Sequence, residues 1–165
     1  MIELLAALAL APWAHPLAFR PSTGWRAGAS GNVLSQYGPS SSRRPQESTA
    51  WMARGVRYRD GATEDPPNTT LAHLPSAAVL VWAVIFQGQQ SREQKPISLD
   101  LDRAKHFLCC EGEFVAGGMY ELHGFGPRRA YTVYVRIYFG SRPTVASRAE
   151  AARALSRLAL PAPRV

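Results

Sequence analysis

Residues 130–139 alternate between apolar and mixed side chains, and this period of two constrains the fold more than any other feature. In a β-strand, successive side chains point to opposite faces of the sheet, so the pattern predicts a strand rather than a helix. One face is expected to be wholly apolar and therefore buried. It carries Tyr131, Val133, Val135, Ile137 and Phe139, and the opposite face carries Ala130, Thr132, Tyr134, Arg136 and Tyr138.

Other segments predict further strands around this one. Residues 78–87 form a continuous apolar run, which is typical of a central strand covered on both faces. Residues 119–125 precede a Gly-Pro turn, and we expect them to pair with 130–139 as an antiparallel hairpin. Weaker strand patterns occupy residues 17–19, 25–34, 50–59 and 97–101, and a single helical turn is expected over residues 70–74.

The C-terminal segment predicts a helix. Ser147 followed three residues later by Glu150 fits a capping box, and Pro161 is expected to stop the helix. Its expected apolar stripe consists of Val145, Ala149, Ala152, Leu155 and Ala159. Together these segments predict an α+β fold, an antiparallel β-sheet of about six to seven strands with a C-terminal α-helix packed on it.

The length of 165 residues suits one domain with a short leader. Residues 1–14 resemble a signal peptide, because an apolar run ends in Ala9-Leu10-Ala11, although no basic segment precedes it. The run is too short to cross a bilayer, which takes about 20 residues. We therefore predict a secreted or cell-surface protein; an ordinary apolar N-terminal helix is the alternative. The single domain is expected to span residues 15–160, with a flexible loop at 38–49 and a tail at 161–165.

The formal net charge is +7, and 17 of the 19 basic residues are arginine. These residues are spread along the chain in runs of no more than two. A polyanion-binding protein is recognised by the clustering of its basic residues. The dispersion favours a solvated surface with a coding bias toward arginine, so no nucleic-acid partner is expected. Binding to an anionic polymer, such as nucleic acid or an acidic cell-wall polymer, remains an alternative.

Three stretches in order carry a resemblance to known proteins. They are residues 19–25 (Phe-Arg-Pro-Ser-Thr-Gly-Trp), the strand 79–86 after Leu74-Pro75, and residues 131–140 followed by the Ala-rich helix. In this order they resemble small uncharacterised exported proteins of high-GC actinobacteria and, more distantly, the PsbP-like fold. The resemblance implies an antiparallel sheet with helices and an exported location, and it carries over no catalytic residue.

Two cysteines and two histidines are candidates for metal or thiol chemistry. Cys109 and Cys110 are adjacent, and a disulfide between neighbours strains the peptide, so free thiols are favoured over a bonded pair. His106 and Cys109 have a spacing usable by zinc, and His123 is a third candidate ligand. Structural zinc sites usually show two paired ligand motifs, and only one is present here. We therefore predict no metal site.

The mixed face of residues 130–139 is the most promising binding surface. Tyr134, Arg136 and Tyr138 lie on it, and Glu121 and His123 of the neighbouring strand are expected to join them. Tyrosine and arginine side chains together are common in sites for ligands and protein partners. They are also ordinary residues on the outer face of a sheet, so this assignment is a hypothesis about these five residues.

Motifs for catalysis are not recognisable in the sequence. It contains no nucleophile elbow, phosphate-binding loop or dinucleotide fingerprint, and the pair Asp100 and Asp102 is expected to be solvated. No catalytic residue and no cofactor are therefore predicted. The leading hypothesis is a non-enzymatic exported domain that binds a ligand or protein partner through its sheet face. The alternative is an enzyme or metal-binding protein that uses His106, Cys109, Cys110 and His123.

Overall fold

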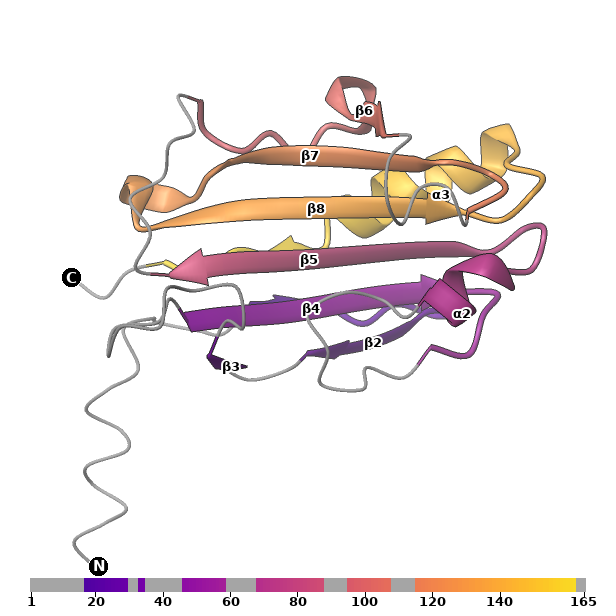
Figure 1. Ribbon diagram of the computed structural model, residues 1–165, viewed down its shortest axis with the longest axis horizontal. Coiled ribbons are helices and arrows are strands. Elements are labelled where there is room, and N and C mark those ends of the chain that lie inside the picture. The colour runs from indigo at the N-terminus through magenta and orange to yellow at the C-terminus, as the bar shows by residue number, and fades with distance from the viewer. Residues whose placement is uncertain are drawn as a thin grey trace, which may run out of the picture.

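The computed structural model describes residues 17–29, 33–34, 46–58, 68–87, 95–107 and 115–162 (Figure 1). These residues form mostly strands, with one longer helix near the C-terminus. The strands are β1 (Ala18–Phe19), β2 (Arg26–Ala29), β3 (Val33–Leu34), β4 (Gln46–Arg54), β5 (Val79–Gln87), β6 (Lys105–Phe107), β7 (Met119–Phe125), β8 (Tyr131–Phe139) and β9 (Leu158–Ala159). The helices are α2 (Asn68–Ala72) and α3 (Val145–Leu155), with 3₁₀ turns η1 (Leu101–Arg103) and η3 (Pro127–Arg129).

The main sheet has the strand order β2-β4-β5-β8-β7-β6, and β3 also pairs with β4. Every pair of neighbouring strands in it is antiparallel. Strands β5 and β8 lie at its centre, where Val81 pairs with Met52 on one side and Ile137 on the other. β1 and β9 form a separate two-stranded antiparallel sheet. The predicted α+β fold with an antiparallel sheet is confirmed.

The two faces of the main sheet bury separate apolar clusters. The face toward α3, here the α3 face, carries the apolar residues predicted for β8 together with Met52, Val81 and Leu155. The opposite face, here the α2 face, buries Leu80, Trp82 and Tyr138 with Leu71 of α2. In Figure 1, α2 lies in front of the sheet and α3 behind it. β5 contributes to both clusters because both of its faces are apolar, as its sequence predicted.

Helix α3 begins earlier than the sequence predicted. Its N-cap is Thr144, whose hydroxyl accepts a hydrogen bond from the Ser147 amide at 3.1 Å. The Ser147 hydroxyl in turn accepts one from the Thr144 amide at 3.3 Å. A capping box is therefore present, but Ser147 is its third helical residue rather than its N-cap. The capping box predicted at Ser147 and Glu150 is wrong by three residues.

The buried side of α3 also differs from the predicted stripe. Val145 is 87% exposed, and Ala149 and Ala152 are exposed as well. The helix instead buries Ser147, Ala151, Ala154 and Leu155. Both sets have the helical spacing i, i+4, i+7, and small residues occur on several sides of this helix. Hydrophobic periodicity therefore could not select the right side, and Leu155 alone was assigned correctly to the core.

Two further expectations need correction. Residues 97–101 were predicted to be a strand, but Pro96 makes only an isolated bridge with Phe125 and the chain then enters η1. Asp100 ends the extended segment, because its side chain accepts from the Asp102 amide at 3.1 Å and caps the 3₁₀ turn. Residues 38–49 were predicted to form a loop, but residues 46–49 belong to β4 and pair with β5.

Within the described residues, no helix is both long and apolar enough to span a membrane.

Candidate functional site

Four of the five predicted site residues lie together on the α2 face. Glu121 and His123 come from β7, and Tyr134 and Arg136 come from β8. The register pairs Glu121 with Arg136 and His123 with Tyr134. Directly paired residues of antiparallel strands project from the same face, so the four side chains form two adjacent rows. We call these four residues the sheet-face cluster.

An ion pair forms the first row of the sheet-face cluster. Arg136 Nε donates to Glu121 Oε2 at 3.1 Å. The two side chains are only 20% and 10% exposed, so the charges are largely withdrawn from water. His123 Nδ1 lies 3.5 Å from the other carboxylate oxygen, Oε1 of Glu121. Glu121 thus interacts with a permanent cation on one side and a titratable ring on the other.

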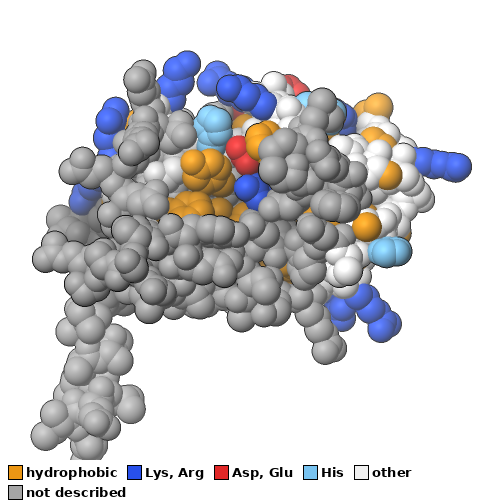
Figure 2. Space-filling model, viewed as in Figure 1, with side chains coloured by type: hydrophobic (Ala, Val, Ile, Leu, Met, Phe, Trp, Pro, Cys, Tyr) orange, Lys and Arg blue, Asp and Glu red, His pale blue; other side chains and the backbone are white. Residues whose placement is uncertain are grey.

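Aromatic rings lie beside the sheet-face cluster. The Arg136 guanidinium lies 5.6 Å from the centre of the Trp82 ring, within the range of a cation–π interaction. Tyr134 contacts His123 and Phe86 edge to face, with ring centres 6.0 Å and 5.7 Å apart. The Trp82 indole N–H is buried and has no hydrogen-bond partner among the described residues. Figure 2 shows basic, acidic, histidine and hydrophobic side chains meeting near the centre of this face.

The fifth predicted residue, Tyr138, lies in the core. Its register partners are Leu80 and Met119, and its exposed fraction is 0%. A ligand on the sheet surface would not contact it in this structure, so we remove Tyr138 from the candidate site. Thr132, on the same face of β8, is also buried. The sequence alternation identified the face correctly but could not show which part of it the core covers.

The alternative metal or thiol site is not assembled by the described residues. His106 pairs with Tyr120, and their rings lie 5.1 Å apart on one side of the sheet. Tyr120 contacts the α3-face core, whereas His123 contacts Tyr134 on the α2 face. His106 and His123 therefore project from opposite faces. Cys109 and Cys110 lie outside the described residues, among which no group of three potential metal ligands occurs.

The carboxylate pair Asp100 and Asp102 has a local structural role. Asp100 caps η1 and lies 3.7 Å from Arg103, and both of these side chains are largely exposed. The chain therefore places Asp100 at a turn rather than in a cleft.

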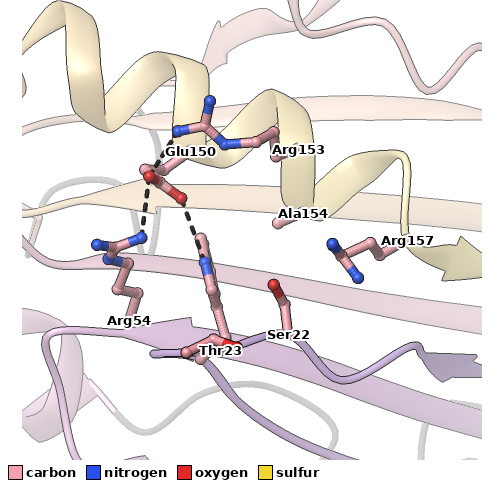
Figure 3. A pocket seen from close by; sticks show the side chains of 8 residues that line it. Ser22, Thr23, Arg54, Glu150, Arg153, Ala154 and Arg157 are labelled. Carbon is pink, nitrogen blue, oxygen red and sulfur yellow. Dashed lines mark hydrogen bonds and ion pairs between the residues drawn. The ribbon is translucent and has the colours of Figure 1, made fainter.

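A pocket on the other side of the molecule was not predicted from the sequence. It has a volume of about 280 Å³ and lies between the segment after β1, the end of β4, and α3 (Figure 3). Its lining consists of Ser22, Thr23, Trp25, Arg54, Glu150, Arg153, Ala154 and Arg157. These residues come from three segments that are distant in sequence, so no local sequence motif predicts the pocket. In the sequence, Glu150 was interpreted as part of a capping box and the dispersed arginines as a solvated surface, so neither pattern indicated a pocket.

No protein-family model matches the chain, and no curated protein or solved structure matches it either.

Proposed function

We propose that this chain is an exported, non-enzymatic domain that binds a ligand or protein partner through the sheet-face cluster. The observation that carries the proposal is the largely buried Glu121–Arg136 ion pair within an aromatic part of the sheet. The export part of the proposal is supported by the signal-peptide pattern of residues 1–14, which lie outside the described residues.

The ion pair is costly for the fold alone. Withdrawing two charges from water carries a desolvation penalty that their mutual attraction often fails to repay. Apolar residues of similar volume would pack on Trp82, which already contacts Arg136, without that cost. A binding role accounts for the ion pair, because charged groups fix the orientation of a ligand that apolar contacts alone leave variable.

The chemistry of the sheet-face cluster favours a ligand with hydroxyl groups and an apolar face. Arg136 supplies hydrogen-bond donors and Glu121 supplies acceptors, while Tyr134 is half-buried and offers part of its ring. Sugar rings combine these features, since their C–H faces pack on aromatic rings and their hydroxyls bond to charged groups. We therefore propose a carbohydrate as the ligand class.

A glycan array probed with the labelled full chain tests this proposal, followed by calorimetric titration of the sugars that bind. The variant Tyr134→Ala with Arg136→Ala should weaken binding by at least about tenfold, because a charge-assisted hydrogen bond alone contributes about that factor. Arg142→Ala is the matched control: Arg142 is exposed, and it does not belong to the cluster. If the double variant binds every sugar as the wild type does, the site assignment is wrong. An array without any bound sugar contradicts the ligand class.

A further inference from the structure

The pocket of Figure 3 is built by contacts that hold its walls in place. The Arg157 guanidinium donates from Nη1 to the Pro21 carbonyl at 3.2 Å, and the Arg20 amide donates to the Arg157 carbonyl at 3.0 Å. These bonds connect the segment after β1 to the turn that follows α3. Trp25 Nε1 donates to Glu150 Oε2 at 3.3 Å across the same gap. The pocket walls are therefore linked by three hydrogen bonds between segments distant in sequence.

Positive charge predominates in the pocket lining. Three arginines and one glutamate line it, which gives a formal charge of +2. Arg54 Nη1 lies 2.9 Å from Glu150 Oε1, and Arg153 bonds to that same oxygen. Figure 3 shows Arg54 and Arg153 converging on Glu150, with Arg157 on the opposite side of Ala154. Arg157 bonds to a neutral carbonyl, so no carboxylate of the pocket lining pairs with the Arg157 charge.

The contacts of the Glu150 carboxylate determine the charge of the ligand that the pocket can bind. Both of its oxygens already accept hydrogen bonds or ion pairs from the pocket wall, so Glu150 is poorly placed to hold a ligand cation. Each guanidinium carries five N–H donors and uses only some of them on Glu150 or Pro21. The remaining donors, with the Ser22 and Thr23 hydroxyls, suit an acceptor-rich anion.

We propose that this pocket binds a phosphate- or sulfate-type oxyanion, either as the free ion or as the terminal group of a phosphomonoester. Arg157 is the principal contact, with Ser22 and Thr23 donating from the neighbouring segment. The volume of about 280 Å³ lies just below the range of about 300–1,000 Å³ for small-molecule pockets. The occupant is therefore a small group. The pocket lies on the α3 side and shares no residue with the sheet-face cluster, so this inference is independent of the proposed function.

Titration calorimetry of the full chain with sodium phosphate and sodium sulfate tests the inference, with chloride replacing the anion in a matched control. We expect saturable binding of phosphate and sulfate that weakens as sodium chloride is added. Arg157→Gln removes the charge but leaves a polar side chain, and it should lower the affinity by about tenfold. Arg142→Gln removes the same charge from an exposed position outside the pocket and should leave the affinity unchanged.

Glu150→Gln gives an expectation of the opposite sign. Removing the carboxylate takes negative charge out of the pocket and releases Arg54 and Arg153, so phosphate should bind several-fold more tightly. A loss of folding cannot imitate this gain. No saturable binding to the wild type, equal losses in Arg157→Gln and Arg142→Gln, or weaker binding to Glu150→Gln would each overturn the proposal.

Two further ligands distinguish the source of the oxyanion. Glycerol 3-phosphate presents a soluble monoester, and vesicles of phosphatidylcholine with phosphatidic acid present the same group on a membrane. Tighter binding of the soluble monoester than of inorganic phosphate assigns the pocket to a phosphorylated small molecule. Tighter binding of the vesicles, abolished by Arg157→Gln, assigns it to a lipid head group. Equal affinities assign it to the free ion.

Discussion

At the scale of single residues, Glu150 interacts with three side chains, those of Trp25, Arg54 and Arg153. The hydrogen bond from Arg153 is the main cause that lowers the pKa of Glu150, and the Trp25 indole and the charge of Arg54 act in the same direction. A carboxylate whose pKa is lower in the folded chain than in the unfolded chain stabilises the fold in its ionised form. That contribution is complete above the unfolded pKa of about 4.3 and is lost as the pH falls through the folded pKa.

We expect Glu150→Gln to lower the free energy of unfolding by at most about 1 kcal/mol at pH 7, since its partners Arg54 and Arg153 are substantially exposed. The difference from the wild type should be smaller at about pH 3, because the lowered pKa of Glu150 means that its stabilising contribution is lost as the pH falls. Urea denaturation at the two pH values measures it. Asp102→Asn, at an exposed carboxylate of η1, is the control. A difference that stays constant across this range contradicts the ionic origin of the effect.

At the scale of elements, the sequence predicted the strands more accurately than the helix α3. In β8 each residue of the predicted apolar face is completely or almost completely buried. The prediction succeeded because a strand has only two faces, and only one of them is wholly apolar. In α3, alanines occur on several sides, so contact with the sheet rather than hydrophobicity selected the side that carries Ala151 and Ala154. The alternation of residues 97–101 failed to predict the structure, because Asp100 caps a 3₁₀ turn that begins at Leu101.

The capping box of α3 makes a prediction at this scale. Thr144→Ala removes the hydroxyl that accepts from the Ser147 amide, and it should cost about 1 kcal/mol of stability. Thr144→Ser keeps the hydroxyl and should restore most of that loss. Thermal unfolding followed by circular dichroism measures both. Equal stability of the two variants would place the start of α3 elsewhere, for example at the Ser147 position that the sequence suggested.

At the scale of the whole molecule, the sheet separates two candidate sites. The sheet-face cluster lies on the α2 face, and the arginine-rich pocket lies beside α3 (Figures 1 and 3). The first could be predicted, because Glu121, His123, Tyr134 and Arg136 sit on two adjacent strands with a recognisable hairpin. The second could not, because Ser22, Arg54 and Arg157 meet only after three segments distant in sequence have packed together.

The measurement that tests the central claim most directly compares stability and sugar binding in Glu121→Leu with Arg136→Met. Apolar residues often replace a buried ion pair without loss of stability, or with a gain of about 1–4 kcal/mol. If the ion pair serves binding, urea denaturation of this variant should show an unchanged or higher free energy of unfolding. Calorimetric titration should then show that sugar binding is lost. A strongly destabilised variant would show that the ion pair holds the sheet together. A variant that binds sugars as the wild type does would show that the ion pair is not part of a binding site.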